Sequence, residues 1–169
     1  MTTQSILLAV TGLTPQVVTE TLYALHAQGD RLPAAIHILT TVEGYQHAKL
    51  TLINDGWLGR FCQDYHLNQP EFAEAYIHVL RQANGEPLTD IRTQVDNQAM
   101  ADAITEWIRT FTADPHIDLH VSIAGGRKTM GFYAGYALSL YGRTRDRLSH
   151  VLVSPDYESH TQFYYPTPY

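Results

Sequence analysis

The sequence contains a single cysteine, Cys62, among its 169 residues. An internal disulfide is therefore excluded, and so is a cage of thiolates around a metal ion. No apolar run reaches the roughly 18 residues that a membrane helix needs. The short apolar segment 6–10 has neither the basic region nor the cleavage site of a signal peptide. We therefore expect a cytoplasmic protein that has no membrane partner.

Positive charge is also scarce. Lys and Arg number 11 against 17 Asp and Glu, which gives a formal net charge of -6. Proteins that coat a long duplex carry a basic face, so we do not expect a long nucleic acid as a partner. An acidic protein can still bind a compact anion where its few cations and its helix N-termini converge on one spot.

Two common nucleotide-binding patterns are missing, namely G-x-x-x-x-G-K-[ST] and G-x-G-x-x-G. The nine histidines show no metal-ligand spacing. His116 and His120 are four residues apart, but Pro115 and the strand expected after it make a shared helical face improbable. We predict neither a metal nor a cofactor, and we assign the histidines to structural or surface positions.

Short apolar runs alternate with amphipathic stretches, without repeats or low-complexity segments. The segment Gln4–Val10 ends in Ile-Leu-Leu-Ala-Val, which is typical of a strand buried on both faces. Thr14 as N-cap and Pro15 as first residue predict a helix that Gly29 ends. Further strands are expected over 34–39, 73–80, 119–124 and 148–153, with a short one over 162–165. Further helices are expected over 43–53, 57–65, 96 or 97 to 111, and 127–141.

Strands and helices thus alternate almost throughout the chain. This order predicts an α/β, Rossmann-like fold, in which a mostly parallel sheet carries helices on both faces. The length suits one domain over residues 1–169. Ligands of such sheets bind beyond the carboxyl ends of the strands, so candidate site residues are expected in the loops there.

The loop after the first strand reads Thr11-Gly12-Leu13-Thr14-Pro15. Gly12 permits a tight turn and a close approach of a ligand. Two threonine hydroxyls are available, and the next helix points its positive end at the loop. A plain strand-to-helix turn explains the same residues equally well, so this loop alone decides nothing.

The loop after the strand over 119–124 carries the stronger signal. Two glycines free backbone N–H groups, and Arg127 and Lys128 lie in the expected first helical turn, where the helix dipole disfavours cations. Such an arrangement directs backbone donors, the dipole and two charges at one anion. A solvated basic turn is the less favoured alternative. The predicted phosphate-binding loop comprises Ser122, Ala124, Gly125, Gly126, Arg127, Lys128 and Thr129.

Two further sets of polar residues follow the second and third strands. The first set either lines the same crevice or caps the next helix. The second set either closes over a ligand or belongs to a solvated loop, and we favour the solvated loop. The sets are Thr40, Thr41 and Glu43, and Asp90, Arg92 and Asn97. The tail from Tyr157 to Tyr169 is interpreted as an interface or a strand edge, and Tyr133, Tyr136 and Tyr141 as helix packing or dimer contacts.

The two loops with their flanking residues resemble the CRISPR-associated Rossmann-fold (CARF) domain of small type III CRISPR accessory proteins. The matching segments are Ile6–Tyr23, with Thr-Gly-Leu-Thr-Pro-Gln, and Ser122–Met130, with Gly-Gly-Arg-Lys-Thr. Segments 148–155 and 163–168 fit the same family. The resemblance spans nearly the whole chain and implies a single CARF domain over residues 1–169.

The resemblance implies a homodimer that binds one cyclic oligoadenylate across its two-fold axis, with cyclic tetra-adenylate favoured over the hexa-adenylate. A ring of an even number of nucleotides can share that symmetry. The chain would then be the second-messenger sensor of type III antiviral defence, with a fused or associated effector domain. The expected ligand contacts are Thr11, Gly12, Leu13, Thr14, Thr40, Asn97, Ala124, Gly125, Gly126, Arg127, Lys128 and Thr129.

The alternative function is a metal-independent ring nuclease. A ribose 2′-hydroxyl would attack the adjacent phosphate and leave linear products with 2′,3′-cyclic phosphate ends. Lys128 would stabilise the developing charge, and Thr11 or Ser122 would orient the hydroxyl; no general base is apparent. A conventional dinucleotide enzyme is disfavoured, because its fingerprint is missing and Glu43 is the only acidic residue near the end of the second strand.

Overall fold

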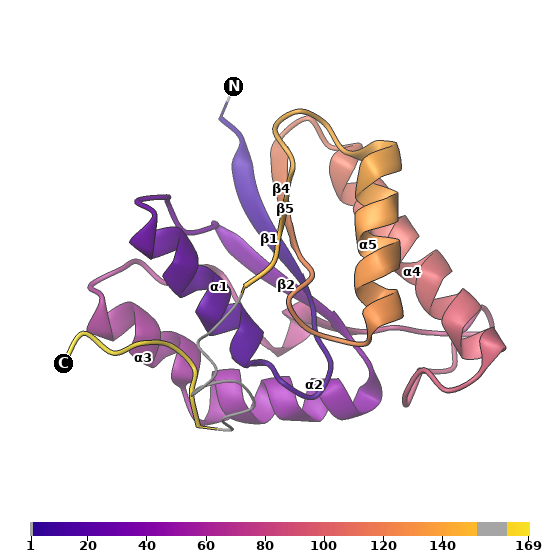
Figure 1. The fold of residues 1–169 in the computed structure, drawn as a ribbon, viewed down its shortest axis with the longest axis horizontal. Coiled ribbons are helices and arrows are strands. Elements are labelled where there is room, and N and C mark those ends of the chain that lie inside the picture. Colours follow the sequence, from indigo (N-terminus) through magenta and orange to yellow (C-terminus); the bar gives the residue numbers. More distant parts are fainter. Residues whose placement is uncertain (1, 152–161) are drawn as a thin grey trace.

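The computed structural model describes residues 2–151 and 162–169 (Figure 1). Its centre is a five-stranded sheet in the order β3-β2-β1-β4-β5, and every neighbouring pair is parallel. The predicted α/β, Rossmann-like fold is therefore confirmed. The strands are β1 (Gln4–Val10), β2 (Ala35–Thr40), β3 (Ile77–Val79), β4 (Ile117–Ser122) and β5 (Arg147–Ser149).

Helices cover both faces of the sheet (Figure 1). One face packs against α4 and α5, and the other against α1, α2, η1 and α3. Among the described residues, no helix is long and apolar enough to cross a membrane. The helices are α1 (Gln16–Ala27), α2 (Val42–Ala48) with its π-helical continuation η1 (Lys49–Asn54), α3 (Trp57–Asp64), the 3₁₀ turn η2 (Glu74–Tyr76), α4 (Gln94–Thr112) and α5 (Lys128–Tyr141).

The unbroken apolar run of β1 follows from this layering. Ile6, Leu8 and Val10 pack with α4 and α5, whereas Leu7 and Ala9 pack with the helices of the other face. All five are at most 5% exposed. Because successive side chains of a strand point to opposite faces, a strand covered on both sides favours apolar residues at every position.

Three predicted boundaries at the carboxyl side of the sheet are wrong by one to three residues. Helix α4 begins at Gln94 instead of Asp96 or Asn97, because Thr93 and Asp96 form a reciprocal capping box. Helix α1 begins at Gln16, with Pro15 as its N-cap residue, and Thr14 makes no capping bond. Strand β4 ends at Ser122 instead of Ala124, since its pairing with β1 ends there.

The third predicted strand is also shorter than 73–80. Residues 74–76 form the 3₁₀ turn η2, and only Ile77–Val79 pair with β2. Near the C-terminus, the strand expected over 148–153 is β5; residues 150–151 have left the sheet, and 152–153 lie outside the described residues.

The tail residues 162–169 are not a strand, which corrects that prediction. Tyr164 and Tyr165 are instead buried in the core of their own chain. Tyr164 stacks on Trp57 with ring centroids 4.3 Å apart, and its carbonyl accepts a hydrogen bond from the Thr19 hydroxyl at 2.6 Å. Aromatic packing on α3 and a hydrogen bond from α1 therefore hold this tail. Residues 157–161 of the predicted interface lie outside the described part.

Candidate functional site

The strand order places a topological switch point between β1 and β4. After β1 the chain crosses to β2 on one side, and after β4 it crosses to β5 on the other side. Ala9 is paired with Ser122, so both strands end at the same level, at the lower edge in Figure 1. In parallel α/β sheets, the crevice beyond such a point is where ligands bind.

The two loops singled out in the sequence meet at this crevice. A Cβ atom added to Gly12 would lie 3.3 Å from Cα of Gly126. Gly126 has a φ of +81°, which favours glycine. A Cβ atom on Gly125 would lie 3.0 Å from Cγ2 of Val17 and 3.2 Å from the Val10 carbonyl oxygen. These glycines let the two loops pack against each other.

A cavity of about 370 Å³ lies on the β1 side of this junction and is called the Glu43 cavity. Glu43 comes from the first turn of α2, and its carboxylate makes no hydrogen bond or ion pair with another described residue. The lining also includes apolar side chains and glycine backbone. Its residues are Gly12, Leu13, Thr14, Thr41, Glu43, Asp90, Gly126, Arg127 and Met130.

A second cavity, of about 610 Å³, lies between the starts of α4 and α5 and is called the Lys128 cavity. Lys128 is exposed, and its ammonium group has no carboxylate or other polar partner among the described residues. Gly126 and Arg127 line both cavities. The lining residues are Ile91, Arg92, Thr93, Asn97, Gly126, Arg127, Lys128 and Thr129.

Helix α5 begins at Lys128 without a side-chain cap. Arg127, predicted in the first helical turn, is the N-cap residue, with an extended backbone (φ -68°, ψ 152°). The first amides of a helix have no acceptor within the helix, and the helix dipole favours an anion there. The Lys128 cavity therefore combines free N–H donors with an unpaired ammonium group.

Arg127 differs from Lys128 because it already holds a carboxylate. Its Nε and Nη2 donate to Oδ1 and Oδ2 of Asp90 at 3.1 and 2.6 Å. Asp90 also accepts hydrogen bonds from the Ile91 amide and from Nε of Arg92. The bond from Arg127 is the main cause that holds the pKa of Asp90 well below its usual range. Asp90, interpreted as part of a solvated loop, is thus a structural partner of the site.

The Asp90 pair also affects the guanidinium. The hydrogen bond to Asp90, and more weakly the charge of Glu43, raise the pKa of Arg127. The charge of Arg127 is therefore largely offset inside the protein, and Lys128 is left as the free cation of the junction. The sequence did not reveal this pairing, because Asp90 and Arg127 are 37 positions apart.

Several predicted contact residues lie below the surface instead of lining either cavity. Thr11 and Thr40 are fully buried, and no described group forms a hydrogen bond with their hydroxyls. Ser122 is 1% exposed, with its hydroxyl oxygen 3.5 Å from that of Thr21 on α1. Ala124 and Gly125 also line neither cavity, although they are only half-buried. The structure therefore brings Gly12, Leu13, Thr14, Asn97, Gly126, Arg127, Lys128 and Thr129 to the two cavities.

Thr41 fulfils both of its predicted alternatives. Its hydroxyl accepts a hydrogen bond from the Gly44 amide at 3.4 Å, which caps α2, and it also lines the Glu43 cavity. A long bond of this kind is weak. Because Thr41 directly follows β2 and caps α2, the start of α2 and Glu43 lie beside the Gly12 loop.

A pair of histidines that the sequence did not single out lies away from the switch point, on β2 and β3. Nδ1 of His37 and Nε2 of His78 are 2.9 Å apart, and His78 packs against Trp107 of α4. Burial lowers the pKa of His78 to about 4. Among the described residues, no three His, Cys, Asp or Glu side chains are placed to hold a metal ion. The two half-buried histidines therefore pack against each other and against the aromatic side chains of α4.

Comparison with known proteins shows the family of the chain. No curated protein matches the chain. A putative UDP-N-acetylglucosamine 2-epimerase from Listeria monocytogenes is similar at 17% identity over 89% of this chain, with a TM-score of 0.41. The chain spans 32% of that protein, and a likeness this remote carries no argument about activity. The family model of CRISPR-associated protein NE0113 matches residues 14–169, so the chain belongs to this CRISPR-associated family, Cas_NE0113.

Proposed function

We propose that this chain is a CARF-type sensor of a cyclic oligoadenylate, with cyclic tetra-adenylate as the favoured ring, in type III CRISPR defence. Membership of a CRISPR-associated family supplies the setting. The observation that carries the proposal is the Lys128 cavity, where an unpaired cation and an uncapped helix start lie at the switch point of a parallel sheet.

The chemistry of this cavity suits a phosphodiester. The single negative charge of the phosphodiester would interact with the Lys128 ammonium group, the first amides of α5 and the positive end of the helix dipole. Hydrogen bonds to charged groups contribute about 1.5–3 kcal/mol each. Thr129 and Asn97, which line the same cavity, add polar groups at its sides.

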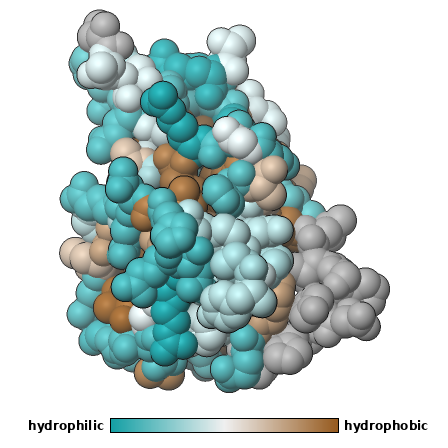
Figure 2. Space-filling model, turned by 90° about the vertical axis from the view of Figure 1, so that its left-hand side faces the viewer, coloured by the Kyte–Doolittle hydropathy of each residue, from teal (hydrophilic) through white to brown (hydrophobic). Residues whose placement is uncertain are grey.

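The outward face of α5 supports the proposal of a homodimer. Phe132, Tyr136 and Leu140 follow one another at four-residue spacing and are 63%, 56% and 58% exposed. Leu148, 48% exposed, extends this face beyond the helix. By contrast, the side of the molecule in Figure 2, opposite to α5, is mainly hydrophilic. Apolar residues gathered on one helix face are typical of an interface.

Lys128 precedes Phe132 by four residues and therefore lies on the same side of α5. A second copy packed on this face by a two-fold axis would bring its own Lys128 to the same region. The two Lys128 sites, one from each copy, would then bind one ring. The fused or associated effector domain would respond to the binding of the ring.

Sensing is preferred over ring cleavage because of where the hydroxyls lie. Thr11 and Ser122, the candidates for orienting the attacking 2′-hydroxyl, are 0% and 1% exposed. At this degree of burial, a ligand on the surface does not reach their hydroxyls. Lys128 can stabilise a phosphate, but cleavage also needs a group that holds the 2′-hydroxyl in line with it.

The test is incubation of the pure chain with labelled cyclic tetra- and hexa-adenylate, followed by calorimetry and chromatography of the products. We expect binding of one intact ring per two chains. Linear products with 2′,3′-cyclic phosphate ends would establish the ring nuclease instead, and absence of binding to both rings would reject both functions.

A further inference from the structure

The Glu43 cavity is unsuited to the phosphate that the Lys128 cavity would accept. Two carboxylates, Glu43 and Asp90, line it. Its one cation, Arg127, already donates two hydrogen bonds to Asp90. A phosphate placed there would meet like charges at close range, which raises its free energy. An anionic group of a ligand is therefore disfavoured in this cavity, whereas a neutral group that carries hydrogen-bond donors suits it.

Of the two carboxylates in this cavity, Glu43 is the one that remains available as a hydrogen-bond acceptor. Both oxygens of Asp90 accept bonds from Arg127, Arg92 and the Ile91 amide. The Thr41 hydroxyl faces the Gly44 amide. The Glu43 carboxylate, in contrast, is exposed and has no hydrogen-bond donor among the described residues. This carboxylate can therefore accept a hydrogen bond from an N–H or O–H group of a ligand.

The other walls of the cavity suit a flat apolar group. Leu13, which is 53% exposed, lines it from the Gly12 loop, and the buried Met130 lines it from the first turn of α5. Between them, Gly12 and Gly126 expose backbone without side chains. Ligand pockets commonly combine apolar walls with a few placed polar groups, within about 300–1,000 Å³, and this cavity of about 370 Å³ lies at the small end.

We propose that the Glu43 cavity holds the adenine base of the nucleotide whose phosphate lies over Lys128, and that Glu43 accepts a hydrogen bond from its exocyclic amine. The inference rests on the proposed function and adds the residue that reads the base. Adenine presents an amine at this position, whereas hypoxanthine presents a carbonyl oxygen. A carboxylate at this position is repelled by that oxygen, and only a shift of the carboxylate to the neighbouring N1–H of hypoxanthine would offset the repulsion, so Glu43 favours adenine.

The experiment compares the affinities of cyclic tetra-adenylate and cyclic tetra-inosinate by calorimetry on the full chain. We expect the wild-type chain to prefer the adenylate ring by about tenfold or more, as for a good base contact. Glu43→Ala should bring the ratio close to one. Removing a negative charge beside a polyanion strengthens the binding of both rings alike, so the ratio isolates the contact to the amine.

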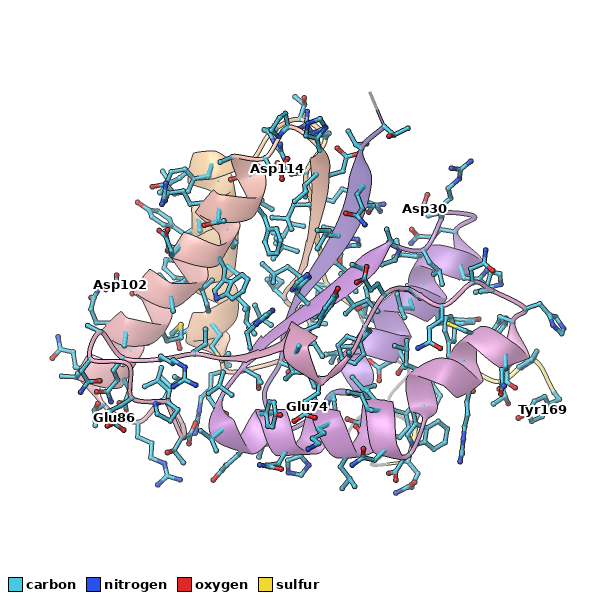
Figure 3. The ribbon with its side chains drawn as sticks, turned by 180° about the vertical axis from the view of Figure 1, so that it is seen from behind. Asp30, Glu74, Glu86, Asp102, Asp114 and Tyr169 are labelled. Carbon is cyan, nitrogen blue, oxygen red and sulfur yellow. The ribbon has the colours of Figure 1, made fainter. Side chains whose placement is uncertain are left out.

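Two further variants control the result. Glu86→Ala removes the same charge from an exposed loop residue outside both cavities (Figure 3) and should keep the wild-type ratio. Glu43→Gln keeps the shape of the side chain, but its amide can also donate to the carbonyl of hypoxanthine. It should therefore narrow the preference. Thermal unfolding of each variant verifies that the fold is retained.

Equal affinity of the wild-type chain for the two rings would overturn the assignment of Glu43 while the sensor function stands. A Glu43→Ala variant that keeps the adenylate preference would overturn it as well. A third arm uses the 2′-deoxy ring: if Glu43→Ala changes only the preference for ribose over deoxyribose, Glu43 reads the sugar and the proposal is wrong. Failure of the wild-type chain to bind any ring would instead reject the sensor function.

Discussion

The Lys128 cavity and the Glu43 cavity share Gly126 and Arg127 but differ in charge. The first has an unpaired ammonium group and a free helix start. The second has two carboxylates and a guanidinium already held by one of them. Two cations adjacent in sequence thus have different surroundings. A nucleotide has the same asymmetry, with an anionic phosphate and a neutral base that carries a donor.

The largest loss of affinity is expected when the unpaired cation of the Lys128 cavity is removed. Lys128→Ala should weaken the binding of cyclic tetra-adenylate by about tenfold or more, because a charge-assisted contact is lost. Calorimetry measures the change. Lys49→Ala is the matched control, since Lys49 pairs with Glu74 away from both cavities and should leave the affinity unchanged. Equal affinities of Lys128→Ala and wild type would reject the phosphate site.

A substitution at Gly126, which lines both cavities, should change the shape of both together. Gly126→Ala places a Cβ atom 3.2 Å from Sδ of Met130 at a φ of +81°. A left-handed conformation costs roughly 1–2 kcal/mol for an L-residue. We expect a decrease in Tm of about 2–8 °C and a severalfold loss of affinity.

Gly56→Ala separates these two effects. Gly56 has a similar φ of +77°, but no atom lies within 4 Å of the added Cβ. It should lower Tm through backbone strain and leave binding unaffected. If Gly126→Ala binds cyclic tetra-adenylate as tightly as Gly56→Ala does, the junction of the two loops is not part of the site.

A third prediction concerns Arg127, which would become an unpaired cation like Lys128 if its carboxylate partner were removed. Asp90→Ala removes the carboxylate that holds the guanidinium, so its donors become available to a phosphate. We expect an increase in affinity of about threefold in calorimetry and a stability loss below about 1 kcal/mol, as for a partly exposed ion pair. Asp102→Ala, on the outer side of α4 (Figure 3), removes an equal charge and should change neither quantity appreciably. A weaker affinity in Asp90→Ala would show that the pair positions Arg127 for the ligand.

The smallest effect on binding is expected from substitution of the buried histidine of β4, His120. Burial lowers the pKa of His120 to about 4, below the value of about 6.5 in the unfolded chain. The unfolded chain then binds more protons between these values, so the free energy of unfolding decreases as pH falls from about 6.5 to 4. His120→Gln should reduce this slope in denaturant titrations, and binding at pH 7.5 should stay the same. If the pH dependence of the free energy of unfolding were the same in His120→Gln and wild type, the lowered pKa of His120 would be contradicted.

The sequence predicted the elements of the fold well because their signals are local. The apolar run of β1 and the glycine corner before α5 needed only their neighbours to be read correctly. The ends of elements were less accurate, since the start of α4 depends on how Thr93 and Asp96 bond to each other. The burial of Tyr164 could not be foreseen, because it depends on contact with Trp57, more than a hundred positions earlier.

The same reason explains which site residues could be predicted. Gly12, Gly126 and Lys128 belong to loops that the sheet topology brings together, and their residue types already indicated an anion site. Thr11 and Ser122 have suitable hydroxyls, but their direction depends on which face of the sheet they occupy. The bond from Arg127 to Asp90 joins segments far apart in sequence, so only the folded chain reveals it.

A crystal structure of the chain with cyclic tetra-adenylate would test the phosphate site most directly. We expect one ring between two chains, with a phosphate of the ring within hydrogen-bond distance of Nζ of each Lys128 and of the first amides of α5. A ring bound elsewhere, with both Lys128 side chains extended into solvent, would contradict the central claim.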